Sequence, residues 1–379
     1  MTAKGPIPLV DLDAQLAVLR ARIEKRLKQV LDQGQYILGP EVAEFEQALA
    51  ELTGARHAIA VASGTDALQL ALMAGGIGPG DAVFVPSLTF VATAEVVAVL
   101  GATPVFVDVE PDTLNMDPAH LETQAERTAS EGKLRPRAVI PVDLFGRPAD
   151  YPSTMEFAER TGMLVVADAA QSLGASLGDT QVGALAPLSA TSFYPSKTLG
   201  GYGDGGCVFA LDDETADTIK SIHRHGYELG GPDIVNIGIN SRLDTMQAAI
   251  LLAKLEVFQD ELAARRRIAK AYNELLLGHV EVPSAYPSGE AAWSVYCIQS
   301  DHRDMLREAL GAQQIASFAY YATPIHLQPA YRAYGEGEGS LPATERAAKR
   351  LLALPMHAYL DEATQQRVCS AIIGALSDR

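Results

Sequence analysis

Short apolar runs alternate with helical segments from about residue 57 to residue 210, and this alternation restricts the folds that are open to the chain. The runs are nearly continuous in Val, Ile, Leu and Ala, which is typical of strands that are covered on both faces. Strands that alternate with helices predict a mostly parallel sheet flanked by helices, which is the α/β fold class. Ligands of such sheets bind at the carboxyl ends of the strands.

The expected elements of this region follow from the spacing of its apolar residues. Strands are expected at His57–Ala62, Ala82–Val85, Val105–Val109, Ala138–Val142 and Leu164–Ala167, and near Ala190–Phe193 and Cys207–Leu211. Helices are expected at Thr65–Ala74, Phe90–Leu100, Pro118–Ala129 and Ser153–Arg160.

The pattern changes in the C-terminal part of the chain. Arg242–Leu277 contains neither Gly nor Pro and has apolar residues at helical spacing, so it predicts a long helix with at most one break. A chain of 379 residues is long enough for two domains, and we expect a large domain at 1–255 and a smaller α/β domain at 256–379. Before a closing helix, the expected elements are the strands Trp293–Ile298 and Ala316–Tyr320 and the helices Arg303–Leu310 and Thr344–Leu352.

Charge and cysteine content exclude several classes of protein. The formal net charge of −17 argues against a nucleic-acid binder, because neutralising phosphates requires a basic surface. Cys207, Cys297 and Cys369 have neither disulfide-like nor metal-ligand spacing and fit a reducing cytoplasm. Neither a signal peptide nor an uninterrupted apolar run of membrane-spanning length is found. We therefore expect a cytoplasmic protein without a membrane segment, a nucleic-acid partner or a metal site.

Two residues at the ends of expected strands point to one cofactor chemistry. Asp168 directly follows the apolar run Val165–Ala167, and Lys197 lies on a loop after a later strand. Pyridoxal phosphate (PLP) needs a lysine that forms a Schiff base with its aldehyde and an acid that pairs with its pyridinium nitrogen. Asp168 has an alternative role as a helix cap, but a buried carboxylate is costly unless it pairs with a cation.

A phosphate site is expected at Ser63–Leu68, which follows an apolar strand and opens a helix. Unpaired backbone N–H groups and the helix dipole favour an anion at such a position. Gly64 lets the backbone approach a phosphate, and Thr65 adds a hydroxyl; the same residues also suit a simple N-cap. Beside the aspartate and the lysine they predict a phosphate site, to which Ser192 could add a second hydroxyl.

Other residues have weaker interpretations. Gln171 could donate to the phenolic oxygen of the ring, and Phe90 could stack on the ring face, although an aromatic there is more often core packing. Gly201–Gly206 contains Gly-x-Gly-x-x-Gly but leads into a strand, so it is not interpreted as a dinucleotide site. His223 and His225 are two positions apart and do not share a helix face, which makes a metal site improbable.

Five ordered motifs resemble those of the DegT/DnrJ/EryC1/StrS sugar aminotransferases, which depend on PLP. The resemblance spans nearly the whole chain and implies the fold-type-I architecture of aspartate aminotransferase. It also implies a homodimer with two shared active sites. The motifs are Gln35–Pro40 with Phe45–Glu46, Ser63–Leu68, Asp168–Gln171, Ser192–Lys197 and Gly238–Ala249.

The resemblance implies roles for single residues. Lys197 would be the Schiff-base residue, and Asp168 would pair with the pyridine nitrogen. Some family members replace this lysine with histidine and act as dehydratases, so the lysine here indicates a transaminase. The remaining PLP contacts would be Gln171 at the ring oxygen, Phe90 at the stacking position, Gly64, Thr65 and Ser192 at the phosphate, and Asn240 from the partner subunit.

The resemblance also indicates a substrate class. The family acts on nucleotide-linked keto-sugars, usually with L-glutamate as amino donor. Many members that aminate C4 have Gly-Tyr-Asn-Tyr-Arg where this chain has Gly-Ile-Asn-Ser-Arg at 238–242. With Pro324–Gln328, this motif is more similar to members that act on UDP- or dTDP-linked 3-keto sugars in amino-sugar and polysaccharide biosynthesis. Substrate contacts are expected from Tyr36, Tyr320, His326 and Gln328. For His326 the default is a position in the core or at the rim, and a substrate contact requires that its loop reach the cleft.

Other functions stay open. One is a C4-specific keto-sugar aminotransferase. Another is a regulator or sensor that keeps the fold without catalysis, because some proteins of this family were first described as regulatory. The joint presence of Lys197, Asp168, Gln171 and the phosphate motif favours an enzyme. A PLP enzyme acting on amino acids alone is disfavoured, because no cysteine is placed near the site.

Overall fold

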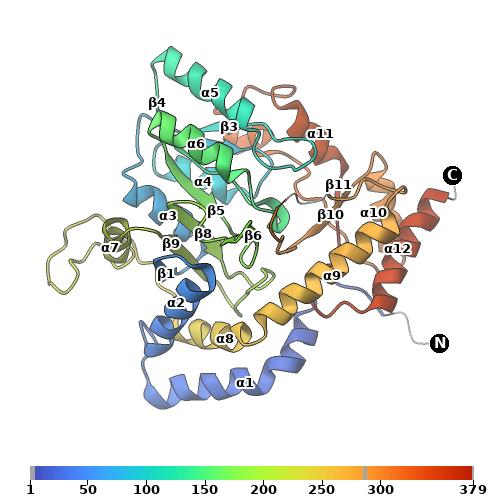
Figure 1. The fold of residues 1–379 in the computed structure, drawn as a ribbon, viewed down its shortest axis with the longest axis horizontal. Coiled ribbons are helices and arrows are strands. Elements are labelled where there is room, and N and C mark those ends of the chain that lie inside the picture. Colours follow the sequence, from blue (N-terminus) through green and yellow to red (C-terminus); the bar gives the residue numbers. More distant parts are fainter. Residues whose placement is uncertain (1–4, 285–287, 378–379) are drawn as a thin grey trace.

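A seven-stranded sheet forms the centre of the molecule (Figure 1). The computed structural model describes residues 5–284 and 288–377. The strands follow one another across the sheet in the order β1-β9-β8-β5-β4-β2-β3. Their bounds are β1 His57–Val61, β2 Asp81–Pro86, β3 Thr103–Val107, β4 Arg135–Val139, β5 Leu164–Asp168, β8 Leu188–Ser192 and β9 Gly206–Ala210.

The sheet is mostly parallel, as expected. The neighbours β3, β2, β4, β5 and β8 pair in parallel, whereas β9 is antiparallel to both β8 and β1. Asp168 lies opposite Ala190 at the ends of β5 and β8, so the loops after these two strands leave the sheet at the same edge. The α/β fold class is therefore confirmed.

Helices cover both faces of the sheet, because side chains of each strand alternate between two apolar clusters. On β2, Val83 and Val85 face the cluster of α3, α4 and α7, while Ala82 and Phe84 face that of α5 and α6. Ala60 and Phe209 face a third cluster, formed with α2 and α8. The bounds are α2 Pro40–Thr53, α3 Gly64–Ala74, α4 Ala92–Val99, α5 Pro118–Glu131, α6 Tyr151–Thr161, α7 Asp213–Ile222 and α8 Thr245–Leu255.

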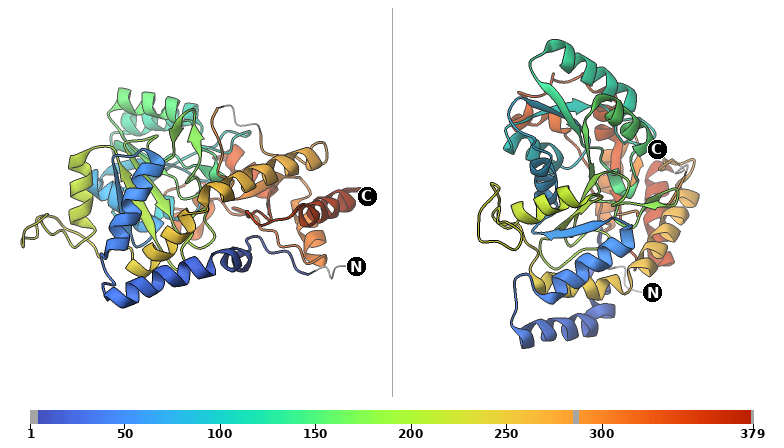
Figure 2. Two further views of the ribbon diagram at one scale, coloured as in Figure 1. Left: turned by 60° about the horizontal axis from the view of Figure 1, so that its bottom comes forward. Right: turned by 60° about the vertical axis from the view of Figure 1, so that its left-hand side comes forward.

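A separate apolar cluster lies in the C-terminal part, around the antiparallel pair β10 and β11. This part of the chain lies at one end of the molecule (Figure 2). Ile7 packs into this cluster, so the N-terminal segment contacts the C-terminal part. The domain division at residue 255 stays a prediction. The bounds here are α9 Phe258–Leu276, β10 Tyr296–Gln299, α10 Arg303–Ala312, α11 Pro342–Arg350, β11 Leu351–Leu354 and α12 Glu362–Ser377.

Shorter elements complete the fold. The predicted long helix is broken once, between α8 and α9. The helix α1, Leu12–Gln33, packs along α8. A two-stranded pair is formed by β6 Ser176–Leu177 and β7 Thr180–Gln181. The single 3₁₀ turns are η1 Leu144–Gly146, η2 Ile325–Leu327 and η3 Pro329–Tyr331.

Some predicted elements differ from the structure. The strand expected at Ala316–Tyr320 is wrong, because only Phe318 pairs there, through one bridge to Ala353. The strand expected at Ala138–Val142 begins and ends three residues earlier, as β4, and Val142 makes only an isolated bridge to Asp168. None of the helices in the described residues is long and apolar enough to cross a bilayer.

Candidate active site

A cavity of about 500 Å³ lies where β5 and β8 end and α3 begins. The structure brings most of the predicted cofactor residues to this one place. The predicted residues that line the cavity are Gly64, Thr65, Phe90, Asp168, Gln171, Ser192, Lys197 and Tyr320. The cysteines Cys207, Cys297 and Cys369 are buried, and none of them lines the cavity.

Asp168 is held in place at the floor of this cavity. Thr93 Oγ1 donates to its Oδ2 at 2.7 Å, and the amide of Ala170 donates to its Oδ1 at 3.2 Å. Burial raises the pKa of Asp168, while the bonds from Thr93 and Ala170 and the charge of Lys197 act in the opposite direction. A carboxylate desolvated in this way is stabilised by a cationic partner, which a protonated ring nitrogen would be. Thr93 was not foreseen from the sequence.

Lys197 lies on the tight turn that follows β8, with its amide donating to Tyr194 O at 2.8 Å. Its side chain is half-buried and lines the same cavity as Asp168. Burial lowers the pKa of the Lys197 amine, and the charge of Asp168 opposes this shift. Because the neutral amine is the form that attacks a carbonyl, burial favours nucleophilic chemistry at Nζ.

Contacts from α8 fix the glycine-rich stretch after Lys197. The amide of Tyr202 donates to Gln247 Oε1 at 2.9 Å, and Lys254 Nζ donates to Gly200 O at 2.6 Å. Lys254 also lies 4.1 Å from the centre of the Tyr202 ring, and burial lowers its pKa to about 8. The glycine-rich stretch is therefore a turn that is hydrogen-bonded to α8. This position agrees with not interpreting Gly201–Gly206 as a dinucleotide site.

The N-terminus of α3 meets the end of β8 at the cavity wall. Ser63 caps the helix, its Oγ accepting from Asp66 N at 3.0 Å, so the N-cap interpretation also holds. A Cβ on Gly64 would lie 2.6 Å from Ser192 Cβ, so the close packing of α3 on β8 requires glycine there. The backbone N–H groups of the first turn have no partner within a helix and can bind an anion.

Replacing Gly64 by alanine should weaken PLP binding by about tenfold, because overpacking of this kind costs about 1–3 kcal/mol and displaces α3 from Ser192. The dissociation constant of PLP, measured by fluorescence quenching, checks this. The matched control is Gly78→Ala, where a Cβ meets no atom within 4 Å. Equal PLP affinity in both variants would contradict the assignment of Gly64 to the phosphate.

Gln171 is oriented from both ends of its amide. Its Oε1 accepts from Phe145 N at 2.8 Å, and its Nε2 donates to Tyr321 Oη at 3.1 Å. Tyr321 lines the cavity and was missed by sequence reasoning. Ser294 also lines it, and its buried Oγ has no hydrogen-bond partner among the described residues. These polar groups fit a ligand with oxygen atoms.

Three predicted residues do not line the cavity. Asn240 is exposed and forms an isolated backbone bridge with Arg224. Tyr36 is 50% exposed. Gln328 donates through Nε2 to Thr323 O at 3.1 Å within its own turn. Roles for these three side chains stay predictions.

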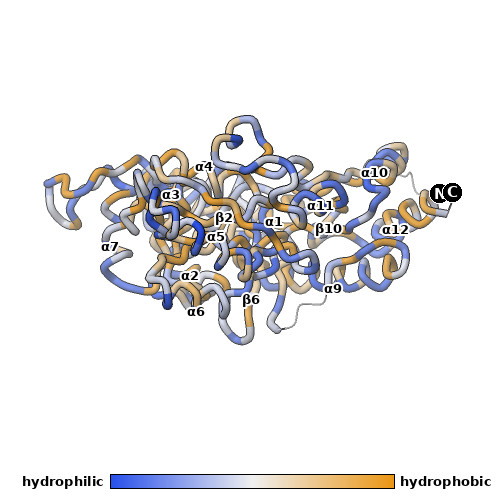
Figure 3. The backbone as a smooth tube through the Cα atoms, turned by 90° about the horizontal axis from the view of Figure 1, so that it is seen from above, coloured by the Kyte–Doolittle hydropathy of each residue, from blue (hydrophilic) through white to orange (hydrophobic). Residues whose placement is uncertain are grey.

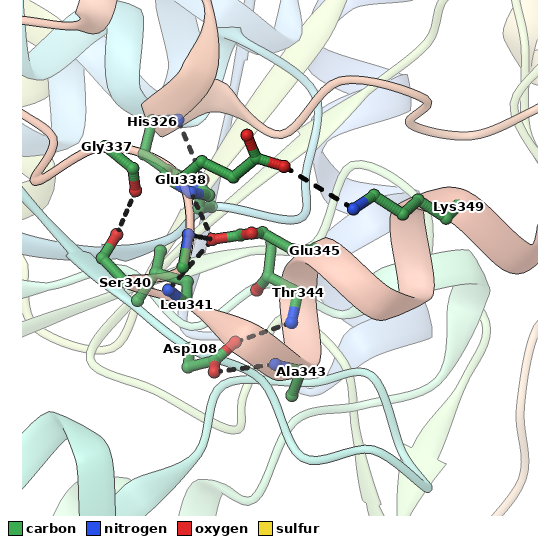
Figure 4. Close-up of polar contacts among 12 residues, drawn as sticks. Asp108, His326, Gly337, Glu338, Ser340, Leu341, Ala343, Thr344, Glu345 and Lys349 are labelled. Atoms are coloured by element: carbon green, nitrogen blue, oxygen red, sulfur yellow. Dashed lines mark hydrogen bonds and ion pairs between the residues drawn. The ribbon is translucent and has the colours of Figure 1, made fainter.

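His326 also lies away from the cavity, buried between the sheet and α11 (Figure 4). Its Nδ1 is 2.7 Å from Ser87 Oγ, and its Nε2 is 3.3 Å from Glu345 Oε1. The ring borders a different cavity, of about 410 Å³, beside β3 and α5. The structure therefore corrects the expected substrate contact, because both ring nitrogens are engaged in the core.

The described residues contain no group of three or more His, Cys, Asp or Glu side chains that could hold a metal ion. The chemistry that the cavity supports is that of an anion-binding helix end, a buried acid and an amine. These are the protein groups that PLP uses.

Three proteins that are similar to this chain are named as two sugar aminotransferases and one regulatory protein. An enzyme of Pseudomonas aeruginosa, UDP-2-acetamido-2-deoxy-3-oxo-D-glucuronate aminotransferase, is 43% identical over 97% of this chain and 99% of its own. The pleiotropic regulatory protein of Geobacillus stearothermophilus is 40% identical over 97% of both chains. The dTDP-3-amino-3,4,6-trideoxy-alpha-D-glucose transaminase of Streptomyces venezuelae is 39% identical over 97% of this chain and 95% of its own.

Solved structures of aminotransferases are also similar to this chain. An aminotransferase from Brucella abortus has a TM-score of 0.95 and 51% identity, covering 97% of this chain and 99% of that one. NtdA from Bacillus subtilis, solved with bound cofactor PMP, has a TM-score of 0.85 and 28% identity, covering 97% and 83%. Residues 18–373 match the model of one family. The chain therefore belongs to the DegT/DnrJ/EryC1/StrS aminotransferase family.

Proposed function

We propose that this protein uses PLP to move an amino group from L-glutamate to the keto carbon of a nucleotide-linked 3-keto sugar. The observation that carries the proposal is that Asp168 and Lys197 line one cavity, where burial raises the pKa of the acid and lowers that of the amine. The similar enzymes of P. aeruginosa and S. venezuelae, whose names contain a 3-oxo sugar and a 3-amino sugar, support the regiochemistry.

The cavity residues fit each part of PLP. The first turn of α3, with Gly64 and Thr65, and the hydroxyl of Ser192 suit its phosphate. We assign Gln171 to the ring oxygen and Phe90, which lines the cavity and is 55% exposed, to stacking on the ring. When bound, PLP supplies an electron sink and carries the amino group between the two substrates.

Lys197 and Asp168 divide the chemical work. The carboxylate of Asp168, held by Thr93, would keep a proton on the ring nitrogen of bound PLP. Lys197 Nζ would accept the proton that leaves the α-carbon of the donor and would donate it again, as a general acid–base group. Burial lowers the pKa of Lys197, which keeps more of this amine in the neutral, proton-accepting form. Tyr320, at the cavity wall, is the proposed contact for the sugar.

The test of this function is its first half-reaction. The visible absorbance of the purified protein with bound PLP should change when L-glutamate is added. One 2-oxoglutarate should be released for each bound PLP that is converted. The protein should then turn over UDP- or dTDP-linked 3-keto sugars faster than 4-keto sugars. Absorbance that does not respond to L-glutamate would favour the regulatory alternative, and faster turnover of 4-keto sugars would contradict the assigned carbon.

A homodimer with shared sites is part of the proposal. The loop after α7 projects from one end of the molecule and carries exposed apolar residues (Figures 1 and 3). Such a patch on a soluble chain indicates a protein interface. Asn240 lies at the end of this loop, and we assign it to the phosphate in the partner's site. The exposed apolar residues are Tyr227, Leu229, Ile234, Val235 and Ile237.

Asn240→Ala should weaken PLP retention, and the defect should be repaired by a mixed dimer. If each site takes Lys197 from one chain and Asn240 from the other, a dimer of Lys197→Ala and Asn240→Ala chains contains one intact site. It should recover about half of the wild-type activity per dimer at low PLP concentration, above either parent. Absence of recovery in a mixed dimer isolated with two affinity tags would refute the shared site.

A further inference from the structure

His326 joins two segments that are far apart in the sequence. Ser87, directly after β2, contacts it twice: Ser87 Oγ lies 2.7 Å from His326 Nδ1, and His326 N donates to Ser87 Oγ at 3.0 Å. The neighbouring Ile325 N donates to Ser87 O at 3.1 Å. Ser87 has no exposed surface and His326 is 1% exposed. The contact is therefore a dry and specific connection, with little room for rearrangement.

The protonation of the imidazole follows from these partners. Glu345 Oε1 accepts from the amides of Gly339 and Leu341 at 2.7 and 3.3 Å, so it is an acceptor for His326 Nε2–H as well (Figure 4). Nδ1 is then unprotonated and accepts the Ser87 hydroxyl proton. Burial lowers the pKa of His326, against the effect of Glu345, which agrees with a neutral ring.

The segment 87–90 leads from His326 into the proposed PLP site. Its last residue, Phe90, lines the cavity, and so does Thr89. Thr89 Oγ1 lies 3.1 Å from Thr93 Oγ1, and Thr93 Oγ1 contacts both Phe90 O at 3.2 Å and Asp168 Oδ2 at 2.7 Å. Thr89 and Thr93 are buried. His326 is thus connected to the acid of the site through Ser87, the backbone of segment 87–90 and the two buried threonines.

We infer that His326 is a positioning residue of the PLP site: it holds segment 87–90 in place, and with it Phe90 and the threonine pair that orients Asp168. The inference rests on the proposed function. It gives His326 a role through Ser87 rather than through contact with the sugar. It also explains why a histidine is suited to this position, since a ring with two nitrogens can connect Ser87 and Glu345 at once.

Two variants break the connection and one keeps half of it. His326→Ala and Ser87→Ala both remove the side-chain bond between the imidazole and Ser87, while the backbone bond from Ile325 N to Ser87 O remains. His326→Asn places an amide near the position of Nδ1, so it can still pair with Ser87, but it cannot reach Glu345. Because one lost buried hydrogen bond weakens a site by about tenfold, PLP affinity should fall by about tenfold in both alanine variants. In His326→Asn it should stay within about twofold.

A matched control perturbs the same region without touching segment 87–90. Asp108, directly after β3, accepts from the amides of Ala343 and Thr344 at 3.0 and 2.7 Å and anchors the start of α11 (Figure 4). Asp108→Asn should lower the melting temperature while leaving PLP affinity unchanged. Any general loosening of α11 therefore shows in this control.

The experiment measures PLP affinity and the visible circular dichroism of the PLP-bound protein. It also measures hydrogen exchange of amides 87–93 in the PLP-free protein. In His326→Ala and Ser87→Ala, the dichroism should decrease and the exchange should accelerate. In His326→Asn and Asp108→Asn, the dichroism and the exchange rate should match those of the wild type. If His326→Ala fails to fold, Ser87→Ala gives the same comparison.

Three results would overturn the inference: unchanged PLP affinity and exchange in Ser87→Ala, equal defects in His326→Asn and His326→Ala, or an equal PLP defect in Asp108→Asn. The proposed function is judged separately, by the wild type. A wild-type protein that does not bind PLP refutes both, whereas a wild type that binds PLP beside unaffected variants refutes only the positioning role.

Discussion

Replacing Lys197 by alanine should lower transamination by at least about 10²–10⁴-fold, the usual contribution of one positioned acid–base group. The loss should be at the upper end of this range or beyond it, because the same amine also bonds the cofactor aldehyde. Lys197 lines the cavity beside Asp168, and burial lowers the pKa of its amine. The amine of Lys254 is already engaged with Gly200 O and cannot replace it.

Borohydride reduction of the PLP-bound protein, followed by peptide mapping, locates the reacting amine independently of turnover. The label should lie on Lys197 in the wild type and be absent from Lys197→Ala. Lys220→Ala is the control, because Lys220 is a lysine of α7 paired with Asp217 outside the cavity. A label on another lysine, or near-normal turnover of Lys197→Ala with L-glutamate, would refute the assignment.

The sheet could be predicted because its strands are buried on both faces. Strands such as β5 are continuous apolar runs whose ends are marked by a polar residue, here Asp168. Their order in the sheet was not predicted, because pairing such as β5 beside β8 depends on contacts between distant segments. The helix α1 was also missed, although Asp11 caps its start and Gly34 its end. Its buried residues are too sparse to dominate the pattern.

The C-terminal part shows the limit of reading short apolar runs. Ala316–Tyr320 has the composition of a strand, yet Phe318 is the one residue in this range that forms a β-bridge. The segment instead brings Tyr320 and Tyr321 to the cavity wall. A strand and a loop that supplies a site can have the same local composition, and only the tertiary position of their side chains distinguishes them.

The site residues that could be predicted are those marked by a local pattern. Asp168 follows an apolar strand, and Gly64 opens a helix directly after one. Thr93 and Tyr321 were missed because their importance comes from neighbours distant in the sequence, Asp168 for Thr93 and Gln171 for Tyr321. His326 was misassigned for the same reason, since its partners Ser87 and Glu345 cannot be recognised without the fold.

Asp168→Asn should leave PLP bound and should lower the rate of the L-glutamate half-reaction by about 10²–10³-fold, the effect of removing one preorganised electrostatic group. An amide cannot stabilise a protonated ring nitrogen, so proton removal from the donor's α-carbon slows. The bond from Thr93 to Asp168 Oδ2 at 2.7 Å can still be accepted by the amide oxygen, which limits the structural change. Stopped-flow absorbance with L-glutamate measures this rate at saturating PLP.

Asp143→Asn is the matched control, since Asp143 is a second buried aspartate that does not line the cavity. Burial raises the pKa of Asp143 to about 7, so near neutral pH the asparagine resembles a form that is already populated. The amide oxygen of an asparagine can still accept from Tyr151 Oη and Ala149 N, as Asp143 Oδ1 does at 2.8 and 2.9 Å. Its NH₂ group then donates to Ser172 Oγ, which in the wild type donates to Asp143 Oδ2 at 2.6 Å. The half-reaction should therefore slow by less than about tenfold in this control. Equal losses in the two variants would mean that the effect comes from disturbing a buried acid, and Asp168 would then lose its role at the ring nitrogen.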